Sequence, residues 1–165
     1  MRDTAEFEAW ALRATPKLFR QARLLVGDWH LAEDLVQDTI AKMYVHWARV
    51  DRDLSPDGYA LRTLFHLFVS RRRLRSSGEI ATDLIPETFD GATIDVETRH
   101  DLARALATLK PLERAVVVAR YLDDRPVASV AALLDRSEGW VRTTSSRALA
   151  RLRVNPLLAP LAALT

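Results

Sequence analysis

The chain has 165 residues, a formal net charge of +2 at pH 7 and no cysteine. This length allows one domain or two small ones, and the lack of cysteine excludes disulfides, thiolate catalysis and cysteine-based metal sites. The four histidines are scattered and the five glycines form no phosphate-binding loop, so we expect no metal, no cofactor and no enzymatic activity. No apolar run approaches bilayer length and no leader is evident, which predicts a cytoplasmic protein without membrane insertion.

Apolar residues recur at spacings of three and four along most of the chain, and this periodicity predicts an all-α protein. The first domain is expected to span residues 1–75. It should contain helices near residues 4–26, 30–48 and 59–75, with a turn-rich loop before the third. These three amphipathic helices can bury a core of their own.

The helix expected at residues 30–48 has a polar face opposite its apolar stripe. Asp34, Asp38 and Lys42 follow one another at intervals of four, so their side chains adjoin on the helix surface. This face suits docking against a basic or polar partner helix. The alternative is an ordinary solvated face.

The helix expected at residues 59–75 mixes aromatic and basic residues on its surface. Rings stack on unpaired bases and arginines neutralise phosphates, so this mixture favours single-stranded or melted DNA. In the alternative interpretation, the phenylalanines are core and the arginines only end the helix. The residues concerned are Arg62, Phe65, His66, Phe68, Arg71, Arg72 and Arg73.

Charge separates the chain into blocks. Residues 76–103 contain seven acidic residues and one basic residue, and basic blocks lie on both sides. Residues 76–94 also have Gly, Pro and acidic residues without helical period, which predicts an acidic, flexible linker. A second helical domain is expected at residues 95–153, followed by an apolar tail at residues 154–165.

The second domain ends in a predicted helix-turn-helix. A short apolar helix at residues 127–134 leads through a tight turn into a helix at residues 138–153. Asp135 should adopt a left-handed conformation in the turn, and Ser137 should cap the second helix. The second helix has an apolar inner face of Val141, Ala148, Leu149 and Leu152, and outward residues Arg142, Thr143, Ser146 and Arg147. This shape suits the major groove of DNA, although a simple helical hairpin has the same outline.

These stretches, in this order, resemble the sigma-70 family of bacterial RNA polymerase sigma factors, in its extracytoplasmic-function (ECF, group IV) branch. The resemblance covers residues 4–153. AEDLVQDT (residues 32–39) looks like the family's most recognisable string, and LKPLERAVVVARYLDD looks like the start of its fourth region. EGWVRTTSSRALARLR matches the family's recognition helix, and YALR with SRRRLR looks like actinobacterial members.

The resemblance implies partners and site residues. The partners would be core RNA polymerase, through its β′ clamp and β subunits, promoter DNA, and in many relatives an anti-sigma factor. Core polymerase would contact Glu33, Asp34, Gln37, Asp38 and Lys42. The minus-ten element would contact Arg62, Phe65, His66, Ser70, Arg71, Arg72 and Arg73, with a flipped-out base held by the loop at residues 49–58. The minus-thirty-five element would contact Arg136, Ser137, Trp140, Arg142, Thr143, Ser146 and Arg147.

The implied function is promoter recognition, promoter opening and transcription initiation as a dissociable polymerase subunit. A stand-alone helix-turn-helix regulator is the main alternative, because it needs only the last helices. An enzyme carrying an added pocket is a third alternative. Trp140 replaces a small residue of relatives, so it would either pack against DNA or cover the inner face of its helix.

Overall fold

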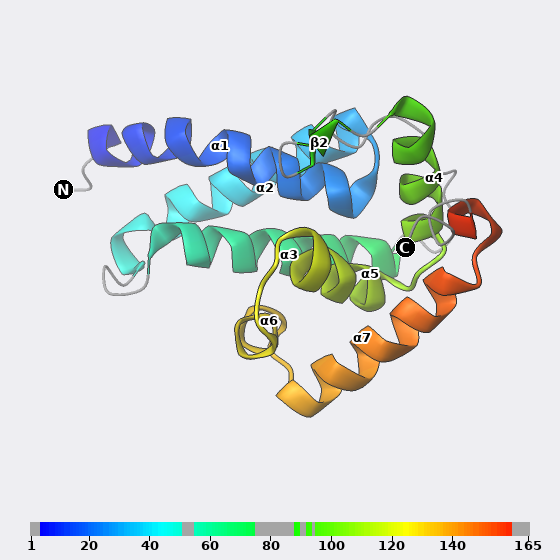
Figure 1. Cartoon of the computed structure of the whole chain (residues 1–165). Helices are drawn as coiled ribbons and strands as arrows, with labels where there is room; N and C mark the ends of the chain where they lie inside the picture. Colours follow the sequence, from blue (N-terminus) through cyan, green and yellow to red (C-terminus); the bar gives the residue numbers. More distant parts are fainter. Residues whose placement is uncertain (1–3, 51–54, 75–87, 90–91, 94, 160–165) are drawn as a thin grey trace.

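The computed structural model describes residues 4–50, 55–74, 88–89, 92–93 and 95–159 (Figure 1). It confirms the all-α fold. The main helices are α1 (Thr4–Val26), α2 (Trp29–His46), α3 (Pro56–Leu74), α4 (Val96–Ala107), α5 (Pro111–Val117), α6 (Val127–Leu134) and α7 (Glu138–Arg153). Three short helical turns follow α2, α5 and α7: η1 (Trp47–Arg49), the π-type turn η2 (Val118–Leu122) and η3 (Pro156–Leu158).

The first three helices form an elongated bundle (Figure 1). Helix α1 runs through Pro16 without ending, and it stops at Gly27, whose φ of 73° lies in the left-handed region that glycine adopts without strain. The carboxylate of Asp28 then accepts a 2.8 Å hydrogen bond from the backbone N–H of Leu31 and caps α2. These local signals set the bend between α1 and α2.

Aromatic rings pack together at the end of this bundle where α1 begins and α2 ends. The ring centroids of Phe7 and Tyr44 are 5.1 Å apart, and those of Trp10 and Trp47 are also 5.1 Å apart. The indole N–H of Trp10 donates a 2.8 Å hydrogen bond to Asp57 in the first turn of α3. The cluster therefore ties the start of α3 to both α1 and α2.

Helix α4 begins directly after Asp95, whose carboxylate caps it by accepting from the N–H of Thr98 at 2.9 Å. Within the expected linker at residues 76–94, the described part is a small antiparallel hairpin of β1 (Thr88–Phe89) and β2 (Ala92–Thr93). The remainder of that linker lies outside the described residues. The division into domains stays a prediction.

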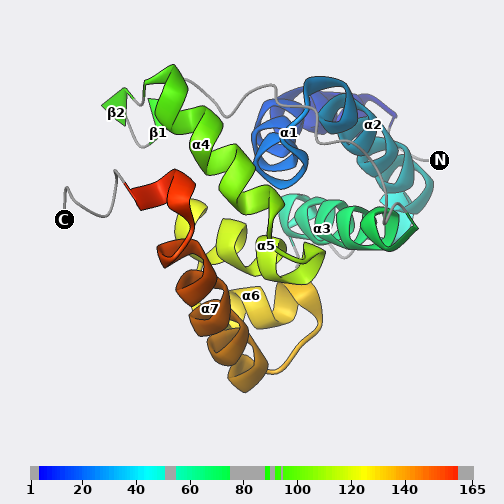
Figure 2. The same cartoon turned by 90° about the vertical axis from the view of Figure 1, so that its right-hand side faces the viewer.

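The two helical groups pack directly on each other. Helix α3 lies against α5 and α6, and Figure 2 shows α3 between α1 and α2 on one side and the second group on the other. Buried side chains of both groups form one connected apolar cluster. Polar contacts add to this interface, since Gln21 donates to Asp123 at 2.8 Å and the buried guanidinium of Arg114 donates to the carbonyl of Leu24 at 3.2 Å.

Candidate nucleic-acid interface

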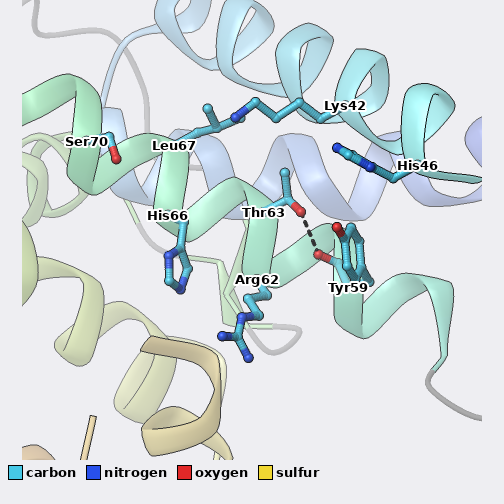
Figure 3. Close-up of a pocket in the computed structure, with 8 residues that line it drawn as sticks. All are labelled: Lys42, His46, Tyr59, Arg62, Thr63, His66, Leu67 and Ser70. Atoms are coloured by element: carbon cyan, nitrogen blue, oxygen red, sulfur yellow. Dashed lines mark hydrogen bonds between the residues drawn. The ribbon is translucent and has the colours of Figure 1, made fainter. Parts of the chain in front are cut away.

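A cavity of about 260 Å³ opens between α2 and α3 (Figure 3). Its upper side is made by Lys42 and His46 of α2. The hydroxyl of Thr63 donates to the carbonyl of Tyr59 at 2.9 Å, which fixes that side chain in the floor of the cavity. The complete lining consists of Lys42, His46, Tyr59, Arg62, Thr63, His66, Leu67 and Ser70.

The chemistry of this cavity suits a nucleotide. Lys42 and Arg62 carry positive charge at its margin, Tyr59 is 38% exposed as a residue, and hydroxyl and imidazole groups offer hydrogen bonds. Cationic groups around an exposed ring are the combination that binds single-stranded nucleic acid. The structure thus brings together Arg62, His66 and Ser70 from the predicted minus-ten set, and adds Lys42 from the predicted polymerase set.

The burial of Phe65 corrects the predicted set of minus-ten contacts. Its side chain is fully buried, and Phe68 is 2% exposed, so neither ring can stack on a base. The reason is that helices cover α3 on both sides, so its apolar side chains are buried in the connected cluster. Arg72 and Arg73 lie in α3, but their side chains, like residues 51–54 of the preceding loop, are outside the described part of the chain.

The polar face of α2 is exposed as predicted. Asp34, Gln37, Asp38 and Lys42 are open to solvent, while Glu33 is half-buried and pairs with His30 at 3.6 Å. Asp38 forms an ion pair with Arg71 of α3. Members of the predicted docking and minus-ten surfaces are therefore neighbours.

The helix-turn-helix forms over the predicted residues. Asp135 has φ 57° and ψ 50°, a left-handed conformation, and Ser137 accepts a hydrogen bond from the N–H of Trp140 at 3.2 Å. The outward residues Arg142, Thr143, Ser146 and Arg147 are exposed, and Arg142 pairs with Glu138 at 2.8 Å. The left-handed turn and the cap of α7 are thereby confirmed.

The inner face of α7 differs slightly from the prediction. Val141, Ala148 and Leu152 are buried, but Leu149 is only half-buried. Ser145 is buried instead, with its hydroxyl donating to the carbonyl of Val141 at 2.7 Å. A serine next to outward Ser146 gives no sequence signal of burial, so only its spacing of four from Val141 indicates this position.

Trp140 is half-buried and lies over the inner face of α7, while a contact of its ring with DNA stays a prediction. Its ring packs against the main apolar cluster, and the guanidinium carbon of Arg136 lies 5.5 Å from the ring centroid. This cation–π contact joins the turn to the first turn of α7. Arg136 itself stays exposed on the outer side.

No group of three or more His, Cys, Asp or Glu side chains capable of holding a metal occurs among the described residues. In the same part of the chain, no helix has the length and apolar character to cross a membrane.

Comparisons with known proteins match both helical groups. Residues 12–77 match the family model of Sigma-70 region 2, and residues 105–154 match that of Sigma-70, region 4. The chain is 35% identical over 154 residues to the RNA polymerase sigma-E factor of Streptomyces coelicolor, covering 93% of this chain and 87% of that protein. It is 33% identical over 152 residues to the RNA polymerase sigma-E factor of Streptomyces avermitilis, covering 92% and 85%.

A solved structure shares the fold. The sigma factor RpoE of Bartonella quintana, crystallised with the anti-sigma factor NepR, superposes with a TM-score of 0.75 at 23% identity, covering 93% of this chain and 96% of that chain. A stand-alone helix-turn-helix regulator would not need the first three helices, which match both in sequence and in fold.

Proposed function

The chain belongs to the sigma-70 family of RNA polymerase sigma factors, in its extracytoplasmic-function branch, and therefore directs transcription initiation by binding core RNA polymerase and promoter DNA. From this premise we propose which surface of the protein makes each of these contacts. The observation that carries the proposal is the cationic cavity between α2 and α3, adjacent to an exposed acidic face on α2.

The cavity takes an unpaired nucleotide of the minus-ten element. Its volume of about 260 Å³ accommodates one base, with Arg62 and Lys42 placed to meet the flanking phosphates. Arg62, His66, Ser70 and Arg71 form this surface, and Phe65 supports it from the core. Arg72 and Arg73 follow in the sequence of the same helix, and we propose that they extend the basic track for the displaced strand.

The outer face of α7 reads the minus-thirty-five element in the major groove. Ser137 and Arg136 stand at the entrance to α7, and Arg142, Thr143, Ser146 and Arg147 follow on its exposed side. Trp140 contributes by holding Arg136 in place, since its ring packs on the core and under that guanidinium. The Arg142–Glu138 pair is half-exposed, so DNA can replace it at small cost.

The exposed face of α2 docks onto core polymerase. Asp34, Gln37 and Asp38 form its centre, with Glu33 and Lys42 at its margins. We further propose that the protein has no catalytic activity of its own, acts in the cytoplasm where polymerase is found, and is a candidate for control by an anti-sigma factor. The last point is supported by the RpoE structure, which contains NepR.

Transcription with core polymerase tests the minus-ten assignment. Arg62→Ala should reduce open complexes on duplex promoters more than on templates mismatched at the minus-ten region, because the pre-opened template avoids the unpairing cost. Arg13→Ala, an exposed substitution on α1, is the matched control. Equal loss on both templates, or no loss on either, would show that the cavity does not capture the melted strand.

Core binding tests the docking assignment separately. The double variant Asp34→Arg/Asp38→Arg should abolish holoenzyme formation while circular dichroism stays unchanged, because both side chains are exposed. Glu8→Arg, an exposed charge reversal on α1, should bind core normally. Normal binding by the double variant would remove this face from the polymerase contact.

A further inference from the structure

Another cavity lies where α1, α3 and the turn after η2 meet. Its volume of about 350 Å³ falls near the lower end of the range for small-molecule sites, about 300–1,000 Å³. None of the residues that line it belongs to the cavity between α2 and α3. Because α1 and α3 belong to the first group of helices and the turn after η2 to the second, a ligand bound here would contact both groups.

One side of this cavity is apolar. Four buried side chains of α1 and α3 form it, and two of them are single methyl groups, which leave space that longer side chains would fill. The four residues are Ala14, Leu18, Ala60 and Leu61. An apolar group of a ligand would be removed from water there, which favours its binding.

Gln21 of α1 brings an unsatisfied acceptor to the lining. The residue is 8% exposed, and its amide N–H donates a 2.8 Å hydrogen bond to Asp123 in the turn after η2. The side-chain carbonyl oxygen of Gln21 is buried and has no hydrogen-bond partner within the described part of the chain. Leaving such an acceptor unpaired costs free energy, and few buried polar groups of native proteins stay so. An N–H group of a ligand in the cavity would supply the missing donor.

Positive charge lies beside this acceptor. Lys17 precedes Gln21 by one helical turn, so both side chains share a face of α1. The Lys17 ammonium has no ion pair and no hydrogen bond with any described residue, and the Arg20 guanidinium adds a second cation to the lining. This margin of the cavity suits a carboxylate, which accepts charge-assisted hydrogen bonds from such groups.

Asp57, in the first turn of α3, supplies negative charge. Its carboxylate accepts a 2.8 Å hydrogen bond from the indole N–H of Trp10 and retains capacity for further donors. The remaining charged residues of the lining, Asp123 and Arg125, form an ion pair with each other. Asp57 is therefore the acid that is left for a cationic group of a ligand.

We propose that this cavity binds a small zwitterion with an apolar side chain, the chemical class of the free α-amino acids. The ligand carboxylate meets Lys17. The ligand ammonium donates to Asp57 and to the carbonyl of Gln21, and the ligand side chain packs on the apolar side of the cavity. None of these residues belongs to the surfaces proposed for DNA or core polymerase, so this site goes beyond the proposed function.

An NMR titration of the full chain with L-leucine tests the proposal. The indole N–H of Trp10 donates to Asp57, so its signal reports on the cavity, and Trp10→Phe identifies that signal by removing it. The indole signals of Trp29 and Trp140, which do not line the cavity, serve as internal references. L-Leucine should shift the Trp10 signal saturably and leave the two references unchanged.

Analogues of leucine separate the contacts that the ligand makes. Isocaproate lacks the ammonium, and isoamylamine lacks the carboxylate. Each loses charge-assisted hydrogen bonds, so each should bind more weakly than leucine by about tenfold or more. Glycine keeps both charges without an apolar side chain and should also bind more weakly than leucine.

A pair of variants locates the ligand on α1. Lys17→Ala removes the cation that meets the carboxylate and should raise the dissociation constant for leucine about tenfold. Arg13→Ala removes a cation from the same helix, outside the cavity, and should leave that constant unchanged. Both side chains are exposed, so both variants should keep the fold, which the rest of the spectrum reports.

Any of three results would overturn the proposal: no saturable shift of the Trp10 signal with leucine, equal affinity for isocaproate or isoamylamine, or equal affinity of Lys17→Ala and the parent. None of them bears on promoter opening or on core binding, because the variants that test those assignments change other surfaces.

Discussion

Substitution of Phe65 separates a structural role from a DNA-binding role. Its ring is fully buried, so Phe65→Ala should lower the free energy of unfolding by ~3–5 kcal/mol, the usual range for a buried phenylalanine. For a chain of this size each kcal/mol corresponds to ~2–4 °C, which gives a fall in melting temperature of about 6–20 °C. Denaturant titration followed by circular dichroism measures the first quantity, and a thermal scan measures the second.

Two further variants control this experiment. The ring of Phe19 in α1 is half-buried and packs edge-on against Trp29, with ring centroids 4.7 Å apart. Phe19→Ala should therefore lower the free energy of unfolding clearly less than Phe65→Ala. Phe65→Leu keeps an apolar side chain and should retain promoter opening in the holoenzyme. The reasoning would be refuted if Phe65→Ala left stability within ~0.5 kcal/mol of the parent, as is usual for surface substitutions, while open complexes were lost.

Other predictions address the second group of helices. Ser137→Ala should destabilise the protein by ~1 kcal/mol in denaturant titration, because the cap of α7 is lost. In a library of minus-thirty-five variants at two salt concentrations, Arg142→Ala should cost ~1–3 kcal/mol and relax preference at one position, and Arg147→Ala should do so at another; a uniform loss with a smaller salt slope would indicate phosphate contact instead. The pKa of Asp95 lies below its usual 3.8, chiefly because the Thr98 hydroxyl donates to it. The stability gained from this depressed pKa is present above that value and is lost as pH falls below it, and Thr98→Val should raise the pKa in an NMR titration.

Much of the fold could be predicted from local sequence signals. The helix expected at residues 4–26 is confirmed as α1, and it is followed directly by Gly27 with its left-handed φ of 73°. The turn at Asp135 and the cap at Ser137 are confirmed for the same reason, since their conformations are fixed by neighbouring backbone groups. Caps and turns depend on residues within a few positions of one another, so they can be predicted directly from one sequence.

The errors concern contacts between distant segments. The sequence predicts Phe65 at the DNA because aromatic and basic residues alternate along α3, and this pattern does not reveal that helices pack on both sides of α3 and bury the ring. The contact of Arg62 with Ala132 spans 70 residues and ends on a backbone carbonyl, a group that every residue carries. A pattern of residue types therefore cannot predict which backbone carbonyl will accept this hydrogen bond.

The distribution of tryptophans gives the molecule natural fluorescent probes. Trp10 and Trp47 lie together in the aromatic cluster of the first helices, and Trp29 packs beside the Arg23 guanidinium at 5.0 Å. Trp140 is the single tryptophan of the sequence after residue 47, and its indole is stacked by Arg136 at the entrance to α7. A protein in which residues 10, 29 and 47 are replaced by phenylalanine would therefore emit from the helix-turn-helix alone. When DNA draws Arg136 away from the indole, the emission of Trp140 should change in intensity and wavelength. Stopped-flow fluorescence could then measure the rate at which the helix-turn-helix binds promoter DNA, without any attached dye.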